Sequence, residues 1–228
     1  MPVIDVIIPA YNEEKAIGLV IDEIPKNLVR NILVGNNNSK DGTRQVAAAH
    51  GAIVLDEPRP GYGYACLKCM DYISQLSQKP DIVVFIDGDH SDYPDQMTLI
   101  LGPILDGRAN LVIGSRALGN KEKGSMTIPQ RFGNWLATRM IRWIYGYVFT
   151  DLGPFRAIDY PSLLKIDMQD KTFGWTVEMQ VKAAKFKLLT AEVPVNYRRR
   201  IGTSKVSGTI KGTILAGYKI IWTILKLI

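Results

Sequence analysis

The stretch DIVVFIDGDHSDYPD occupies residues 81–95 and sets the architecture expected for the whole chain. Its apolar run at 82–86, mostly β-branched or aromatic, is typical of a strand buried on both faces of a parallel sheet. The strand leads directly into Asp87, Gly88 and Asp89. Because ligands of open α/β sheets bind beyond the carboxyl ends of the strands, the sequence predicts a ligand site at these three residues. The glycine lets a backbone and a bound phosphate approach closely.

The spacing of the two carboxylates predicts a divalent cation. Two ionised carboxyl groups so close together repel each other unless a cation lies between them, and oxygen ligands suit Mg²⁺ or Mn²⁺. We interpret Asp87 and Asp89 as a D-x-D site for a metal that carries a nucleotide diphosphate. On the triplet alone an alternative stays open, in which the acids cap the next helix together with Asp92 or Asp95. D-x-D is a short pattern with many chance matches.

The remainder of the chain alternates strand and helix patterns at the spacing of βαβ units. Strands are predicted at 3–9, 31–35, 52–55, 81–86, 110–114 and 191–197. Helices are predicted before Pro25, at 43–50, after the glycine-rich loop 59–64, and at 97–105, 129–147 and 174–186. This order predicts an α/β fold with a mostly parallel sheet and helices on both faces, in one domain at 1–208. Residues 117–128 and 151–158 are expected to be irregular.

Loops at the carboxyl ends of four predicted strands carry polar side chains. They hold Tyr11, Asn12 and Glu13; Asn36, Asn37 and Asp41; Asp87 and Asp89; and Ser115 and Arg116. Because these strand ends share one edge of the sheet, we expect the four loops to line one site. Each loop also has a simpler explanation, with residues 36–39 as turn formers and Asp41 as a helix cap. The convergence of four loops favours the metal site.

Composition and charge narrow the class of partner. The chain has 228 residues, 46% hydrophobic and 22% charged, as in ordinary soluble globular proteins. Its net charge of +6 comes from residues 193–228, where seven of the 28 basic residues and none of the 22 acids lie. This predicts an anionic partner near the C-terminus: phosphate groups, a membrane surface or nucleic acid. Nucleic acid is disfavoured because no aromatic residues are interleaved with the arginine run 198–200.

Two further features bear on location and on cysteine chemistry. The N-terminus, MPVID, lacks the basic start and apolar core of a signal peptide, so a cytosolic protein is expected. Cys66 and Cys69 form a C-x-x-C on a predicted helix, but no second Cys or His pair completes a zinc site. We expect them to be small buried helix residues.

The C-terminal stretch 209–228 has the pattern of an amphipathic helix. On a helical wheel Lys211, Lys219 and Lys226 fall within about a quarter turn, and most isoleucines lie on the other side. The lysines interrupt the stretch too often for a bilayer span, which needs ~20 largely apolar residues. A helix at the membrane surface is expected. The alternative is a helix packed on the same chain or on a second copy in a homo-oligomer, because Leu215 and Trp222 lie on the lysine side.

Seven motifs together resemble family 2 glycosyltransferases of the GT-A fold, and most closely the dolichyl-phosphate and undecaprenyl-phosphate sugar synthases. They are IPAYNE at 8–13, NSKDGT at 38–43, GYG at 61–63, DGD at 87–89, GSR at 114–116, FRA at 155–157 and RIGTSK at 200–205. The similarity extends over nearly the whole chain. It implies a Rossmann-like GT-A sheet and an inverting transfer of a sugar from a UDP- or GDP-linked donor.

The resemblance also implies roles for individual residues. Pro9, Tyr11 and Glu13 would line the nucleotide, Asp87 and Asp89 would hold Mg²⁺ or Mn²⁺, and Arg116, Arg200 and Lys205 would neutralise phosphate charge. The further residues expected to bind substrate are Asn12, Asn36, Asn37, Asp41, Gly61, Gly88, Arg131 and Arg156. Relatives often have Asp-Asp or Asp-Asn where this chain has Asn36-Asn37. Because Asn both donates and accepts, the choice between UDP and GDP donors stays open.

The chemistry of transfer separates two acceptor classes. A departing nucleotide diphosphate gains charge, which the metal and fixed cations stabilise. An acceptor hydroxyl needs a general base, for which Glu178, Asp151 and Asp92 are candidates, and the sequence singles out none. Glu178 at a helix start and Asp151 in a turn also have structural explanations. A phosphate monoester, with a second pKa of about 6, is already an anion and needs no base.

The sequence therefore predicts an enzyme that transfers a sugar to a polyprenyl phosphate, peripheral on the cytoplasmic face of the membrane. One alternative is transfer to a saccharide or other hydroxyl acceptor in cell-surface polysaccharide synthesis. Another is a non-catalytic nucleotide-sugar-binding membrane scaffold. Redox chemistry on a dinucleotide is disfavoured, because Gly61 and Gly63 are not followed by the third glycine of a dinucleotide-binding motif and do not follow the first strand.

Overall fold

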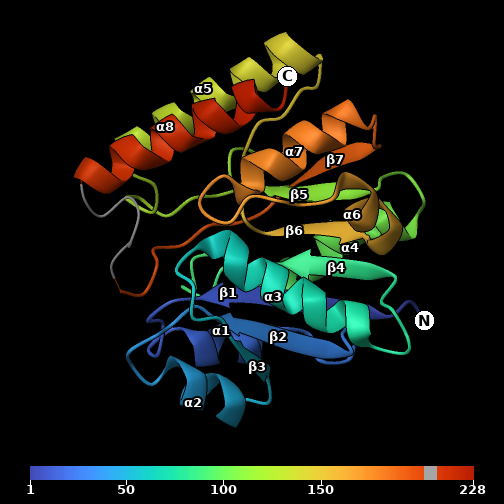
Figure 1. Ribbon diagram of the computed structural model, residues 1–228, viewed down its shortest axis with the longest axis vertical. Coiled ribbons are helices and arrows are strands. Elements are labelled where there is room, and N and C mark those ends of the chain that lie inside the picture. The colour runs from blue at the N-terminus through green and yellow to red at the C-terminus, as the bar shows by residue number, and fades with distance from the viewer. Residues whose placement is uncertain (203–209) are drawn as a thin grey trace.

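The computed structural model describes residues 1–202 and 210–228. Within this part of the chain, seven strands form one sheet in the order β3-β2-β1-β4-β6-β5-β7 (Figure 1). The strands are β1 Ile4–Ala10, β2 Asn31–Asn36, β3 Ile53–Asp56, β4 Ile82–Phe85, β5 Leu111–Ser115, β6 Arg156–Asp159 and β7 Thr190–Pro194. β6 runs antiparallel to β4 and β5, and the other neighbours are parallel. The predicted mostly parallel α/β sheet is confirmed.

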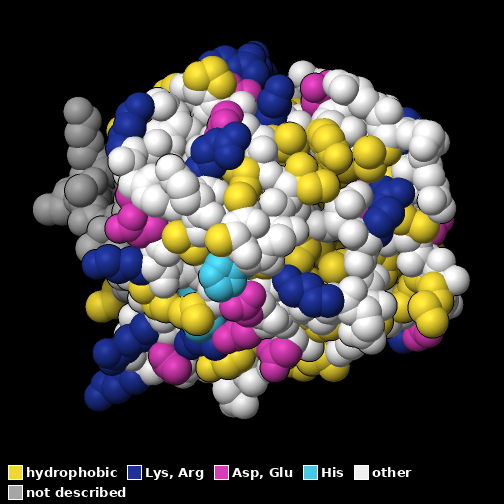
Figure 2. Space-filling model, turned by 90° about the horizontal axis from the view of Figure 1, so that it is seen from below, with side chains coloured by type: hydrophobic (Ala, Val, Ile, Leu, Met, Phe, Trp, Pro, Cys, Tyr) yellow, Lys and Arg dark blue, Asp and Glu magenta, His cyan; other side chains and the backbone are white. Residues whose placement is uncertain are grey.

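Helices cover both faces of the sheet, as predicted. They are α1 Ile17–Glu23, α2 Thr43–Ala49, α3 Tyr62–Gln75, α4 Met97–Leu105, α5 Ile128–Tyr145, α6 Tyr160–Ile166, α7 Trp175–Lys185 and α8 Ile210–Lys226, with a short 3₁₀ turn at Pro94–Gln96. Figure 1 shows α5 and α8 side by side above α7 at one end of the molecule, with α2 at the other end. Figure 2 views that other end from below, where acidic and basic side chains lie close together.

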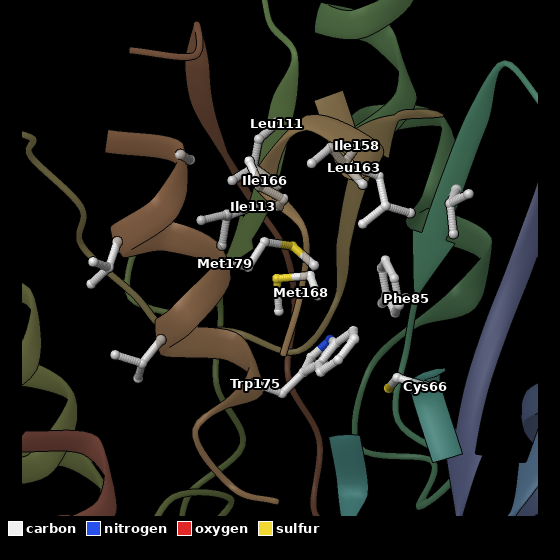
Figure 3. Close-up of a cluster of buried hydrophobic side chains, with 14 of the residues drawn as sticks. Cys66, Phe85, Leu111, Ile113, Ile158, Leu163, Ile166, Met168, Trp175 and Met179 are labelled. Atoms are coloured by element: carbon white, nitrogen blue, oxygen red, sulfur yellow. The ribbon is translucent and has the colours of Figure 1, made fainter. Parts of the chain in front are cut away.

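Two hydrophobic clusters, one on each face, hold the layers together. Alternate strand residues point to opposite faces, so Val83 and Phe85 enter one cluster while Val84 enters the other. The first cluster packs the sheet against α3, α5, α6 and α7, and the second packs it against α1, α2 and α4. Figure 3 shows Phe85 and Trp175 in the first cluster, with ring centroids 5.9 Å apart. Both cysteines of α3 are buried, as expected.

The structure differs from the predictions at 151–166. The stretch expected to be irregular contains β6, which lies between β4 and β5, and α6 follows it directly. The strand was not predicted because residues 151–154 include Gly153 and Pro154, which are typical of a turn. Arg156 also interrupts the apolar alternation, although its side chain is fully buried. Only its pairing with two neighbouring strands makes this segment a strand.

α8 packs on the body of the protein against α5 and α7. Ile224 is fully buried, and its carbonyl accepts a 3.0 Å hydrogen bond from the hydroxyl of Tyr145 on α5. The outward side carries Leu215, Tyr218 and Trp222, which are half or more exposed. Among the described residues, no helix combines the length and the apolar character that a membrane crossing needs.

Candidate functional site

Two adjoining cavities lie beyond the carboxyl ends of β1, β2 and β4. The first, of about 450 Å³, is lined by Pro9, Ala10, Tyr11, Glu13, Asn37, Asn38, Pro60, Gly61, Tyr62, Ala65, Asp87, Gly88, Asp89, Thr172, Phe173 and Arg200. The second, of about 300 Å³, extends from the two aspartates to α5 and α8. Tyr62, Asp87, Asp89, Phe173 and Arg200 line both. The predicted convergence of the loops after β1, β2 and β4 therefore holds in the structure.

The two aspartates stand at the junction of the cavities. The hydroxyl of Tyr62 donates to Oδ1 of Asp87 at 2.9 Å. Oδ1 of Asp89 accepts from the backbone N–H of Ser91 at 2.9 Å and from its hydroxyl at 2.5 Å. Nη1 of Arg200 lies 3.1 Å from Oδ2 of Asp89. Burial, and then the charge of Asp89, raise the pKa of Asp87 to about 6, even with Arg200 beside the pair.

These donor atoms fit a hard divalent cation. Oδ2 of Asp87 has no hydrogen-bond partner among the described residues, and Asp87 lines both cavities. The guanidinium of Arg200 already occupies a cation position at Asp89. The described residues hold no cluster of three or more acids, histidines or cysteines around one point. A metal here would therefore complete its shell with phosphate oxygens and water, as Mg²⁺ commonly does.

Arg116 and Asp151 form a buried ion pair beside the second cavity. Nε and the backbone N–H of Arg116 both donate to Oδ2 of Asp151 at 2.7 Å, and Nη2 donates to Oδ1 at 2.7 Å. Burial alone would raise the pKa of the Asp151 carboxyl, but the contacts with Arg116 outweigh it and lower that pKa. Arg116 also lies over the ring of Tyr197, 5.0 Å from its centroid. Both residues are thus held rigidly, and Arg116 lines the second cavity.

Comparison with known proteins identifies the family. The family model described as glycosyl transferase family 2 matches residues 5–166, more than half of the chain. The chain belongs to glycosyltransferase family 2. An uncharacterized glycosyltransferase of Mycobacterium tuberculosis is 35% identical over 217 residues, with 93% of this chain and 94% of that protein covered. An undecaprenyl-phosphate mannosyltransferase of Micrococcus luteus is 28% identical, with 90% and 88% covered.

A solved structure extends the likeness to the fold and the cofactor. Glucosyl-3-phosphoglycerate synthase from Mycobacterium tuberculosis, crystallised with Mn²⁺, UDP-glucose and phosphoglyceric acid, superimposes with a TM-score of 0.77 at 25% identity. The match covers 99% of this glycosyltransferase and 79% of that chain. The predicted GT-A fold is confirmed. Mn²⁺ in the related structure is consistent with the divalent metal cofactor expected here.

Three residues of the glycosyltransferase expected to bind substrate do not line the first cavity and instead hydrogen-bond to neighbouring residues. Oδ1 of Asn12 accepts from the N–H of Lys40 at 2.7 Å. Nδ2 of Asn36 donates to Asp56 at 2.8 Å, and Asp41 accepts from the N–H of Thr43 at 3.1 Å. Of the expected substrate-binding residues, Pro9, Tyr11, Glu13, Asn37, Gly61, Gly88 and Arg200 do line that cavity. Their binding roles stay predictions.

The candidate bases do not reach the cavities. Glu178 is buried on α7, where it accepts from the N–H groups of Gln169 at 3.0 Å and Asp170 at 2.6 Å and pairs with Lys182 at 2.8 Å. Asp92 is buried, lines neither cavity, and has no hydrogen-bond partner for either carboxylate oxygen among the described residues. With Asp151 held by Arg116, none of the three presents a free carboxylate to the site.

Two predicted cationic residues do not line either cavity, and a third lies outside the part of the chain that the structure describes. Arg156 is fully buried, lines neither cavity and donates to the carbonyls of Leu152, Gly153 and Thr176. Desolvation lowers its pKa to about 10. Arg131 is exposed on α5 and lines neither cavity. Lys205 lies outside the described residues.

Sequence reasoning missed several lining residues. Tyr62 is part of the Gly-Tyr-Gly motif at 61–63, but its contact with Asp87 depends on the tertiary packing of α3 beside the end of β4. Phe173, Trp175 and Asn134 line the second cavity from segments far apart in the chain. The motif at 61–63 was a signal for Tyr62, whereas no local pattern marks the other three.

Proposed function

We propose that this family 2 enzyme transfers a sugar, with inversion, from a nucleotide-diphospho-sugar to a polyprenyl phosphate. The observation that carries the proposal is the second cavity. Its floor is charged, with Asp87, Asp89, Arg116 and Arg200, and its walls toward α5 and α8 are mostly apolar, with Met126, Pro129, Leu152, Trp175 and Ile220 among them. Such a gradient suits an acceptor with an anionic head and a hydrocarbon tail.

The first cavity suits the donor nucleotide. Asn37 bridges two points of the loop before α3: its Nδ2 donates to the carbonyl of Arg59 and its Oδ1 accepts from the N–H of Gly61, both at 2.7 Å. This bridge fixes the wall against which a base and ribose would lie. The UDP-glucose of the related structure supports a UDP-linked donor, and GDP stays the alternative.

The chain's own residues supply charge and position for the transfer. Asp87 and Asp89 would hold the metal, which supplies positive charge to the departing diphosphate. Arg200 lies at the junction of the cavities and Arg116 lines the second cavity. Cations would therefore lie beside the donor diphosphate and beside the acceptor phosphate. The bond between C1 and the diphosphate oxygen breaks while an acceptor oxygen bonds to C1 from the opposite face. An acceptor phosphate oxygen already carries the electron pair and charge, so no proton has to leave.

The state of the three candidate bases favours a phosphate oxygen over a hydroxyl. Asp151, Glu178 and Asp92 do not offer an accessible carboxylate to the cavities. A hydroxyl acceptor requires a general base within hydrogen-bond reach. The experiment supplies radiolabelled UDP- and GDP-sugars with Mn²⁺ and compares undecaprenyl phosphate, phosphoglycerate and soluble glycans as acceptors. Transfer only to glycans or phosphoglycerate would overturn the proposal, and nucleotide binding without any transfer would favour the scaffold.

The outer side of α5 and α8 supports a location at the membrane surface. Neither helix contains an acidic residue, and their exposed basic side chains among the described residues are Arg131, Arg139, Arg142 and Lys226, whereas Lys219 pairs with Asp170. Exposed aromatic residues accompany them: Phe132, Trp135, Trp143, Tyr218 and Trp222. The opposite end of the molecule instead mixes acidic and basic side chains (Figure 2). Aromatic rings with flanking cations are typical of a surface that lies in the headgroup region of anionic lipid.

A further inference from the structure

We propose that Asp170 and Lys219 are positioning residues that link α8 to the first cavity through residues 169–174. This stretch, the 169–174 segment, connects α6 to α7 and contacts α3, α7 and α8. The proposal deepens the proposed function, because it assigns to α8 a part in holding the nucleotide site. It rests on four sets of contacts, which follow in order from α8 inward.

The first contact is an ion pair between the segment and α8. Nζ of Lys219 lies 2.8 Å from Oδ2 of Asp170, whose side chain is 7% exposed against 33% for Lys219. A carboxylate so far removed from water requires a compensating charge or donors. Lys219 supplies the charge, so the ion pair depends on where α8 is seated.

The same carboxylate orders the segment itself. Oδ1 of Asp170 accepts from the backbone N–H groups of Thr172 at 2.7 Å and Gly174 at 3.1 Å. Gly174 also lies close to α8, since a Cβ built on it would stand 2.6 Å from Oγ1 of Thr223. One aspartate thus holds the turn with one oxygen and the neighbouring helix with the other.

The third set of contacts joins the segment to the first turn of α3. The carbonyl of Lys171 accepts from the N–H of Tyr64 at 3.2 Å. A Cβ on Gly61 would stand 2.1 Å from that carbonyl oxygen, and a Cβ on Gly63 would stand 1.9 Å from the carbonyl oxygen of Asp170. Side chains at these positions would push the segment away. Both glycines therefore permit direct backbone packing beside the cavity wall that Asn37 fixes at Gly61.

The last contact is the segment's own share of the site. Thr172 and Phe173 line the first cavity, and Phe173 lines the second as well. On the other side, Gly217 and Ile220 of α8 line the second cavity. A ligand in the second cavity therefore touches the helix that Lys219 ties to the segment. A ligand bound in the second cavity can therefore influence the wall of the first cavity, where the nucleotide would bind.

The test measures nucleotide affinity without any acceptor. The Kd of UDP with Mn²⁺, and of GDP with Mn²⁺ in parallel, is determined by calorimetry for wild type, Lys219→Gln, Asp170→Asn and the double variant. Asn at 170 keeps an oxygen for Thr172 and Gly174 and removes the charge. We expect each single variant to raise the Kd about three- to fivefold, the range of a partly exposed ion pair, and the double variant to raise it no further.

Two variants serve as controls. Lys226→Gln removes a lysine two turns further along α8 that lines, with Asp170 and Lys219, a third cavity of about 370 Å³ between α8 and the segment, but forms no ion pair among the described residues. Lys219→Arg keeps the charge. Both should bind UDP within about twofold of wild type. All variants are checked to be fully folded at the assay temperature by their unfolding transitions, so that altered affinity is not a folding defect.

Any of three results would overturn the proposal. The Kd could be unchanged in Lys219→Gln and Asp170→Asn, the increases in Kd of the single variants could multiply in the double variant, or Lys226→Gln could raise the Kd equally. Because no acceptor is present, the measurement does not depend on the acceptor assigned above. The comparison of Kd values among the variants is the same whichever acceptor the enzyme uses. The two proposals can therefore fail separately.

Discussion

Nη1 of Arg200 lies 3.1 Å from Oδ2 of Asp89, and Nη2 of the same side chain lies 3.0 Å from Oε1 of Glu13. A side chain from the C-terminal quarter of the chain thus neutralises a carboxylate at the end of the central strand β4. A metal ion that binds Asp89 competes with Arg200 for that oxygen. The displaced guanidinium stays beside the first cavity, where a diphosphate would lie.

Removing the metal or its proposed ligand should abolish transfer. We expect EDTA to stop the reaction, excess Mn²⁺ to restore it, and Asp89→Asn to lower kcat/KM by about 100-fold or more, because the leaving diphosphate loses its main electrostatic support. Initial rates of sugar transfer measure this. The matched control is Asp95→Asn, an exposed acid of the 3₁₀ turn Pro94–Gln96. Activity of Asp89→Asn close to that of Asp95→Asn would contradict the metal site.

Breaking the buried ion pair should destabilise the protein. Asp151→Ala leaves the guanidinium of Arg116 buried without its bidentate partner. We expect the free energy of unfolding to fall by about 3–5 kcal/mol in urea titrations. Asp106→Ala breaks an exposed pair with Arg108 of the same 2.7 Å length and should cost at most about 1 kcal/mol. Equal losses at both positions would show that burial is not the cause.

Glu178→Gln separates a structural role from a catalytic one. The Gln side chain can still accept from Gln169 and Asp170, so we expect kcat to change by less than about threefold and the unfolding free energy to fall by about 1–3 kcal/mol as the charge-assisted bonds weaken. Transfer kinetics and urea titration measure the two. A general base would instead lower kcat by about 10²-fold or more. Such a loss would return Glu178 to the reaction.

The stability of Asp92→Asn should depend on pH. Burial, and then the charge of Asp87, raise the pKa of the Asp92 carboxyl well above its usual value. A raised pKa in the folded state stabilises the fold below the unfolded pKa, and this contribution is lost as the pH rises through the folded value. The variant, which cannot ionise, should therefore gain in melting temperature over wild type from pH 5 to pH 8. Melting curves of both proteins across this range measure the difference, and a difference that stays constant with pH would contradict the prediction.

Vesicle binding tests the outer side of α5 and α8. We expect wild type to sediment with vesicles that contain anionic lipid, and binding to weaken with salt, because each basic residue near the surface contributes about 1 kcal/mol. Trp135→Ala with Trp143→Ala should weaken binding at every salt concentration, since exposed rings anchor in the headgroup region. Leu19→Ala with Leu99→Ala, which removes exposed side chains of α1 and α4, is the control. Equal binding of both double variants would count against this surface.

The sequence alone determined the alternation of strands and helices, the place of the D-x-D pair after a buried strand, and the resemblance to the family. These features are written in local patterns, because apolar periodicity and strand-end chemistry involve residues close together in the chain. The predicted helix 97–105 coincides with α4 Met97–Leu105. The loops at Tyr11, Asn37 and Asp87 converge as parallel strands require.

Only the tertiary structure decided which polar side chains face the cavities. Arg156 and Glu178 looked like substrate or base residues, yet partners from other segments bury them in structural contacts. The segment at 151–159 became part strand because β4 and β5 stand on either side of it. α8 buries Ile224 because α5 and α7 offer an apolar surface, its Lys219 pairs with Asp170, and its Tyr218 and Trp222 stay half or more exposed. Each of these outcomes depends on contacts between residues far apart in the chain, which no local pattern encodes.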